Sequence, residues 1–238
     1  MDMNTSLIML QKIMTAQIHK NDVVANNLAN VSTNGFKKET AFFDILTENS
    51  KAPKVQVQTS YKQGPLQQTG NPFDLAIRGD GFFVVETESG EALTRDGHFS
   101  VSEDGFLVNG SNHYVQGMSG SINLPLDEFS AGDISVNDSG EIYIDSQFMG
   151  QLKVVQVDDP SRLKKAGDNL FKAPSGYTTA ASPASTVLQG QLEGSNVNPI
   201  VEMVQLIELQ RQFESSQRAM SAIDSVMNKA ANDISRVT

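Results

Sequence analysis

The chain has 238 residues and a formal net charge of −10, and hydrophobic residues make up 39% of it, with no Trp. The acidic excess lies almost entirely between two nearly neutral terminal segments, and the absence of a basic stripe argues against nucleic acid as a partner. No cysteine is present, which excludes disulfides, thiolate chemistry and cysteine-ligated metals. The modest apolar content indicates that partners supply part of the stability.

The start of the chain does not read as a secretory signal. Residues 1–19 are amphipathic, and no small-residue cleavage site follows a continuous apolar run. No stretch approaches the roughly 18 apolar residues that a membrane-spanning helix needs. We therefore expect no membrane insertion, and either an intracellular protein or one exported without a cleavable signal peptide.

Apolar residues at alternating three- and four-residue spacing predict a first helix from about residue 4 to residue 32. This spacing averages 3.5 residues, the period at which a helix keeps one seam facing a partner helix. Asn34 and Gly35 are expected to end the helix as a left-handed cap.

The helical period is lost after the first helix. Residues 36–72 contain several Pro and Gly and predict an extended linker or hairpin segment. From residue 73 to 195, short apolar runs such as 75–77, 82–85 and 142–144 alternate with Asp-Gly turns. This pattern predicts an antiparallel β-rich domain, either a barrel or a sandwich.

A second long helix is predicted from Pro199, a residue suited to a first helical turn, to about residue 236. At about 1.5 Å per residue it would be roughly 57 Å long, which is more than a compact domain of this size can cover. A second apolar stripe of Ile200, Val204 and Ile207 is expected to contact the β-rich domain.

These elements predict an α+β fold in which the N- and C-terminal helices form a coiled-coil-like helical domain around an inserted antiparallel β-rich domain. The expected division is 1–35 with 196–238 as the terminal helical (assembly) domain, 36–72 as the linker, and 73–195 as the β-rich outer domain. The candidate assembly seam consists of Leu7, Leu10, Met14, Val24, Leu28, Val31, Leu206, Leu209, Phe213, Met220, Ile223 and Met227.

The seam has two interpretations. It can pack against other copies of the chain, or it can close as a helical hairpin within one chain, without any assembly role. Three polar residues, Gln17, Asn21 and Ser216, interrupt the seam. Because a buried polar seam residue lowers stability while it fixes register, these residues favour pairing with defined neighbours.

Three blocks of sequence resemble, in order, the signatures of flagellar rod and hook proteins. The first is residues 25–31 with 35–37, the second lies within residues 70–108, and the third within 192–214. Together they span nearly the whole chain. The matching signature residues are Asn26, Asn27, Leu28, Ala29, Asn30, Gly35, Phe36, Gly79, Gly81, Phe82, Phe83, Gly194, Asn196 and Val197.

The resemblance is to the flagellar basal-body rod protein family of rod and hook axial proteins. It implies a structural subunit of the rod in the periplasm, which polymerises axially through its terminal helices and transmits torque for motility. The partners implied are copies of itself, other rod and hook subunits, and the flagellar type III export apparatus. Within this family, the short segment 36–70 favours a proximal-rod (FlgF-type) protein over a distal-rod (FlgG-type) one.

The signature asparagines also have a physical interpretation. Asn26, Asn27 and Asn30 lie near the end of the first helix, beside seam residues. An amide side chain both donates and accepts hydrogen bonds, so it can tie a helix end to an adjacent chain. Alternatively, each Asn caps the helix locally. The presence of three such asparagines favours contacts between chains.

No residue pattern indicates catalysis. Residues 161–164 fit a Ser-x-x-Lys string without its companion motifs, and His19, His98 and His113 lack zinc-ligand spacing. Residues 137–140 resemble part of a calcium loop without its acidic series. We expect no catalytic residue, cofactor or metal, and no enzymatic activity. The alternatives are a distal-rod or hook-type axial protein, or a secreted β-rich binding module or adhesin that its helices dimerise.

Overall fold

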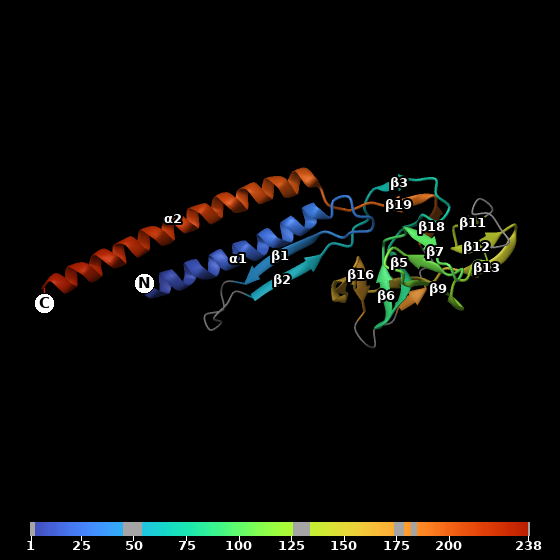
Figure 1. Ribbon diagram of the computed structural model, residues 1–238, viewed down its shortest axis with the longest axis horizontal. Helices are drawn as coiled ribbons and strands as arrows, with labels where there is room; N and C mark the ends of the chain where they lie inside the picture. Colours follow the sequence, from blue (N-terminus) through green and yellow to red (C-terminus); the bar gives the residue numbers. More distant parts are fainter. Residues whose placement is uncertain (1–2, 45–53, 126–133, 174–178, 182–184, 238) are drawn as a thin grey trace. The chain divides into compact units, whose positions relative to one another are not determined.

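The computed structural model describes residues 3–44, 54–125, 134–173, 179–181 and 185–237 (Figure 1). The chain forms two compact units. The helical unit consists of Met1–Ala29, Glu39–Ser60 and Asn198–Thr238, and the β-rich unit of Asn30–Lys38 and Tyr61–Val197. The chain therefore passes between the units four times. The domain division expected from the sequence stays a prediction.

Two helices and one hairpin make up the helical unit: α1 (Met3–Ala29), α2 (Pro199–Val237), β1 (Glu39–Asp44) and β2 (Lys54–Thr59). α1 contains no Gly or Pro, and the only Pro of α2 is its first residue, so neither helix is interrupted. Asn198 caps α2, because its Oδ1 accepts hydrogen bonds from the backbone N–H groups of Ile200 at 3.0 Å and Val201 at 3.3 Å.

α1 ends earlier than the sequence predicted. Its last residue is Ala29, and a turn follows in which the backbone N–H of Thr33 donates to the carbonyl oxygen of Asn30 at 3.2 Å. Gly35 does have the expected positive φ of 68°, but it lies beyond this turn. Its N–H donates to the carbonyl oxygen of Glu193 at 2.7 Å, so it does not cap the helix.

The hairpin lies against α1 (Figure 1). β1 and β2 pair antiparallel, from Glu39 opposite Thr59 to Asp44 opposite Lys54. Ala41 is buried, whereas Phe42, which points to the other face of the two-stranded sheet, is exposed. The hairpin therefore has one face on the helix and one facing away from it.

The β-rich unit is antiparallel in every strand pair that the structure describes. Its elements are β3 (Leu66–Gln68), β4 (Leu75–Arg78), β5 (Gly81–Thr87), β6 (Gly90–Thr94), β7 (Phe99–Val101), β8 (Leu107–Asn109), β9 (Tyr114–Gly117), β10 (Gly120–Ser121), β11 (Ile134–Val136), β12 (Glu141–Ile144), β13 (Gln147–Gln151), β14 (Val154–Val157), η2 (Pro160–Arg162), β15 (Lys164–Gly167), β16 (Leu170–Lys172), β17 (Thr179–Ala181), β18 (Thr186–Gln189) and β19 (Gln191–Glu193). The α+β character expected from the sequence is confirmed.

A ten-stranded sheet carries the core of this unit, with the main strand order β15-β16-β6-β5-β9-β8-β7. β5 is its central strand and is buried on both faces. Phe83 packs into one apolar cluster, where its ring meets that of Phe99 at 5.2 Å, and Phe82 packs into a second cluster with Tyr61 and Phe171. Among the described strands the end strands β15 and β7 do not pair, so of the two expected arrangements, barrel or sandwich, the unit has a barrel-like one that stays open as a curled half-barrel.

Candidate assembly surfaces and their buried polar anchors

The two apolar seams meet within one chain. α1 and α2 run antiparallel and pack against each other, with Asn27 beside Glu202 and Gln17 beside Ser216. Val24 and Leu209 are buried in this contact. The other seam residues of the two helices keep part of their surface exposed: Leu7, Leu10, Met14, Leu28, Leu206, Phe213, Met220, Ile223 and Met227. The two helices therefore pair within the single chain and leave part of the seam exposed, and the assembly role of the seam stays a prediction.

Val31 lies apart from the other seam residues because it belongs to the β-rich unit. It lines an open hollow of about 300 Å³ together with Ser32, Asn34, Pro65, Gln67, Gly194, Ser195 and Val197. The first turn after α1 and the segment before α2 thus meet in the β-rich unit.

The three polar seam residues differ in their hydrogen bonding. The Ser216 hydroxyl lies 3.3 Å from Oε1 of Gln17, to which it can donate across the two helices. Asn21 has no such partner. Its buried Oδ1 accepts no hydrogen bond from any residue that the structure describes. A buried acceptor without a donor lowers the stability of the fold by about 1–3 kcal/mol. A donor from another molecule could recover this loss.

Asn27 ties together three elements of the helical unit. Its Oδ1 accepts from the backbone N–H of Glu39 at 2.9 Å, and its Nδ2 donates to the Glu39 carbonyl oxygen at 2.8 Å. Nδ2 also donates to Oε2 of Glu202 at 3.1 Å, and both side chains are fully buried. This arrangement fixes the register of α1, α2 and β1.

Asn27 therefore uses its amide within the chain, which neither interpretation of the signature asparagines anticipated. Asn26 is exposed, and Asn30 accepts a hydrogen bond from the Thr33 hydroxyl at 3.2 Å. Asn30 thus makes the local contact, while Asn26 lies on the surface where contacts between chains can form. Leu28 and Ala29 lie beside them at the end of α1.

A buried ion cluster lies in the β-rich unit. Oε1 of Glu193 accepts from Nζ of Lys37 at 2.6 Å and from the backbone N–H of Gly64 at 2.8 Å, while its Oε2 accepts from Arg95 at 3.1 Å. Arg95 also donates to the Gly79 carbonyl oxygen at 2.7 Å. The Lys37 and Glu193 side chains are 0% exposed. One carboxylate thus joins four segments of the chain.

The charges in this cluster do not balance. Two cations face one carboxylate, and burial lowers the pKa of both Lys37 and Arg95 from their ordinary values, while Glu193 and the nearby Asp80 oppose that shift. Arg95 lowers the pKa of Lys37 further. Because charged groups are expensive to bury without partners, Glu193 is the residue on which the cluster depends.

Asn196 extends the cluster into a joint, which we define as Lys37, Lys38, Lys62, Glu193 and Asn196. The Asn196 Oδ1 accepts from the backbone N–H of Lys38 at 2.7 Å, and its Nδ2 donates to the Lys62 carbonyl oxygen at 2.9 Å. Nζ of Lys37 donates to the same carbonyl oxygen at 2.9 Å. These residues lie near three of the four points at which the chain passes between its units, after residues 38, 60 and 197.

The remaining signature residues pack around this joint and the core. Gly35 has no room for a side chain, because a Cβ would lie 2.4 Å from the Asp96 nitrogen; at Gly81 it would lie 2.6 Å from the Val154 side chain. Phe36 is buried under Nζ of Lys165, which lies 4.3 Å from the ring centre. Val197 is buried as well, and the N–H of Gly194 donates to the Pro65 carbonyl oxygen at 2.8 Å.

Lys37, Arg95, Glu193 and Glu202 were not among the candidate site residues, although each lies in or beside a quoted signature block. A signal was present for Glu202, a charged residue inside the apolar stretch 200–204, whereas Lys37 and Arg95 stand among other polar residues. Charged residues are almost never fully buried unless they are paired, so such positions indicate ion pairs. Their partners, however, lie too far away in sequence to be read from spacing.

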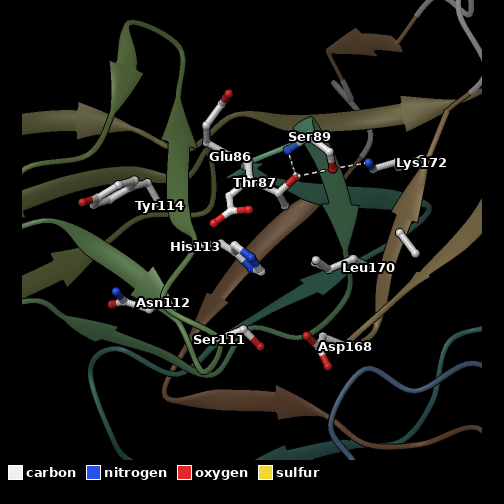
Figure 2. Close-up of a pocket in the computed structure, with 12 residues that line it drawn as sticks. Glu86, Thr87, Ser89, Ser111, Asn112, His113, Tyr114, Asp168, Leu170 and Lys172 are labelled. Atoms are coloured by element: carbon white, nitrogen blue, oxygen red, sulfur yellow. Dashed lines mark hydrogen bonds between the residues drawn. The ribbon is translucent and has the colours of Figure 1, made fainter.

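One hollow of the β-rich unit, of about 660 Å³, is open and polar (Figure 2). Lys172 donates to the Ser89 hydroxyl, and the Ser89 N–H donates to the Thr87 hydroxyl at 3.3 Å. His113, another lining residue, contacts Asn109. Among the described residues no group of His, Asp and Glu could hold a metal ion. No described helix is both long and apolar enough to span a bilayer.

Three family models match the chain. Residues 14–37 match "Flagella basal body rod protein", residues 76–144 match "Flagellar hook protein FlgE/F/G D1 domain", and residues 188–233 match "Flagellar basal body rod FlgEFG protein C-terminal". The matches follow the order of the three signature blocks and include the joint residues Lys37 and Glu193.

Curated relatives match along most of their length. The flagellar basal-body rod protein FlgF of Caulobacter vibrioides is 33% identical over 229 residues, covering 91% of this chain and 92% of that protein. FlgF of Mesorhizobium japonicum is 31% identical, with 96% and 97% covered. The rod protein FlgG of Bacillus subtilis is 32% identical over 247 residues, with 90% and 92% covered.

Proposed function

We propose, given that this chain belongs to the flagellar basal-body rod protein family, that its helical unit is the part through which copies polymerise axially. The chain is a structural subunit of the rod. The observation that carries the proposal is the partly exposed seam: nine of its residues keep surface that a further helix can cover. Each apolar side chain that becomes fully buried contributes about 1.5–3 kcal/mol.

The two helices form a coiled-coil-like pair in this proposal. Their seam residues recur at 3.5-residue spacing and face each other in one chain, and polar Gln17 and Ser216 meet across the contact. The neighbouring copies then pack against the residual seam surface and the outer faces of the pair. Several such contacts in parallel resist shear, which is what transmission of torque requires.

The joint at Lys37, Glu193 and Asn196 serves the same function. The chain segments that connect the two units can carry load from one unit to the other. The joint ties three of those segments together inside the β-rich unit with charge-assisted hydrogen bonds, which are stronger than neutral ones. The role is mechanical and not enzymatic.

A proximal-rod, FlgF-type position is favoured over a distal-rod position. The alignment to FlgG of Bacillus subtilis runs over 247 residues although it covers 90% of this 238-residue chain, so that relative carries residues that this chain lacks. The alignment to FlgF of Caulobacter vibrioides covers 91% of the chain in 229 residues. The distal rod stays the alternative, because both kinds of relative are similar to the chain at 31–34% identity.

The proposed partners are copies of this chain, other rod and hook subunits, and the flagellar type III export apparatus. The proposed location is the rod within the periplasm, reached without a cleavable signal peptide. The amphipathic N-terminal segment, which forms α1, supports this route.

The test is incorporation. The gene is deleted in its own bacterium, a full-length tagged chain is supplied, and basal bodies are purified. We expect the tag in the rod portion of the basal body and the return of motility. Motile deletion cells, or basal bodies without the tag in complemented motile cells, would overturn the proposal. Labelling only next to the hook would replace the proximal assignment with the distal one.

A further inference from the structure

The face of α2 that points away from α1 carries an exposed ridge near the start of the helix. We call Ile200, Val204, Ile207 and Arg211 the outer ridge. These residues recur every three or four positions and so lie along one line. Ile200, Val204 and Ile207 are 71%, 59% and 51% exposed, and the expected contact of this stripe with the β-rich domain stays a prediction. The buried residues Glu202 and Leu209 lie on the opposite side of the helix.

A notch lies elsewhere on the same helical unit, between α1 and α2. Its volume is about 100 Å³, and it is lined by Gln17, Ile18, Asn21, Leu209, Gln210 and Phe213. Ile18 is exposed at its rim. The buried Oδ1 of Asn21, which lacks a hydrogen-bond donor among the described residues, belongs to one of the lining residues. Three apolar side chains (Ile18, Leu209 and Phe213) therefore line the notch together with amides, one of which has an oxygen without a donor.

The ridge and the notch are complementary. A cavity of this size accommodates one aliphatic side chain, since the deletion of a single leucine side chain leaves a space of comparable volume. Ile207 provides such a side chain, and Arg211, one helical turn further along, provides guanidinium donors. Arg211 is the only charged residue among those that form the ridge and the notch, and it can donate to Oδ1 of Asn21.

The ridge cannot fill the notch of its own chain. Leu209 and Phe213 of α2 form part of the notch, while the ridge lies on the opposite face of the same helix. A straight helix cannot fold back on itself, so the occupant has to come from another molecule. A contact between two different surfaces of identical chains is heterologous, and such contacts propagate into rings or filaments.

We propose that the outer ridge of one copy seats in the notch of the next copy, with Ile207 inserted beside Ile18 and Arg211 donating to Oδ1 of Asn21. This inference rests on the proposed function and specifies which faces of the helical unit meet. It accounts for the apolar ridge and for the orphaned amide oxygen with one contact.

Cysteine cross-linking tests the contact in the assembled rod. The natural chain has no cysteine, and a disulfide forms only where two Cα atoms approach within about 7 Å. Basal bodies are purified from cells that carry Ile18→Cys with Ile207→Cys and are oxidised. We expect covalent dimers and longer ladders of the chain. Each single variant should stay monomeric on a denaturing gel.

The matched control is Ile18→Cys with Ser225→Cys, because Ser225 is also exposed on α2 but lies beyond the ridge. It should give no ladder. If the Ile18/Ile207 variant is not incorporated, Asn21→Cys with Arg211→Cys is the second pair, with the same expected ladder. Incorporated chains without cross-links, or equal cross-links in the control, would overturn the ridge-in-notch contact while the rod function stands. Absence of the unmodified chain from basal bodies would overturn the proposed function itself.

Discussion

Nζ of Lys37 lies 2.6 Å from Oε1 of Glu193, although 156 residues separate the two in sequence. The pair is completely buried and shares its carboxylate with Arg95. The family signatures at both ends of the chain thus meet at one carboxyl group. This joint within the chain, and not a surface that binds partners, explains part of the signature sequence.

Glu193→Gln should strongly destabilise the β-rich unit. The substitution removes the one carboxylate that accepts hydrogen bonds from both Lys37 and Arg95, and breaking a buried pair in this way costs about 3–5 kcal/mol. Urea unfolding of the monomer, followed by tyrosine fluorescence and far-UV circular dichroism, measures the loss. Glu91→Gln is the control, because its ion pair with Lys153 is exposed and should contribute less than about 1 kcal/mol. Equal small losses for both variants would show that the cluster does not hold the unit together.

Asn27→Ala should loosen the helical unit. It removes three hydrogen bonds: the one from Asn27 to the buried Glu202 carboxylate and the two between the Asn27 amide and the Glu39 backbone. Each buried group left unpaired costs about 1–3 kcal/mol. Thermal unfolding followed at helical wavelengths should begin at a lower temperature than in the unmodified chain. Asn26→Ala, at an exposed neighbouring position, should change stability by about 0.5 kcal/mol or less. A larger effect at Asn26 than at Asn27 would contradict the anchor.

The carboxyl group of Asp96 should make the stability of the folded chain depend on pH. Burial raises the pKa of its carboxyl group above 3.8, so the folded chain binds this proton more tightly than the unfolded chain. Between pH 3.8 and the raised pKa, stability from this group is therefore lost as pH rises. Asp96→Asn removes the titration, and its amide oxygen can still accept the His98 N–H. Relative to this variant, the unmodified chain should lose stability between acidic and neutral pH in urea titrations. A constant difference across that range would refute the prediction.

Leu28→Asp should abolish incorporation into basal bodies while the β-rich unit stays folded. Leu28 is half-buried on α1, and a charge there opposes both the helix pair and any added helix. Ile223→Asp should behave in the same way from α2. Limited proteolysis of the purified variants should still yield a resistant β-rich core. Normal motility with either variant would count against assembly through the seam.

The helices were predictable from the sequence because their pattern is local. The expected second helix, 199–236, matches α2 within one residue at its end. The expected runs 75–77, 82–85 and 142–144 fall in β4, β5 and β12. Spacing of apolar residues and turn chemistry act over a few residues, so one sequence suffices to read them.

The contacts that define the site were not predictable in the same way. Whether a seam packs against its own chain or a neighbouring one depends on long-range geometry, and both have the same period. The ion cluster joins segments near residues 37, 64, 95 and 193, which no spacing rule relates. The end of α1 at Ala29 was also missed, because the local Asn-Gly signal at 34–35 served a contact with Glu193.

Amide hydrogen exchange tests the central claim most directly. Full-length chain in dilute solution is compared with the same chain in purified basal bodies, peptide by peptide. Assembly through the helical unit predicts that α1 and α2 exchange faster than β5 in the monomer and gain protection in the rod, while β5 and β6 are protected equally in both. Helices protected as strongly as β5 in the dilute monomer, with no gain on assembly, would contradict the account.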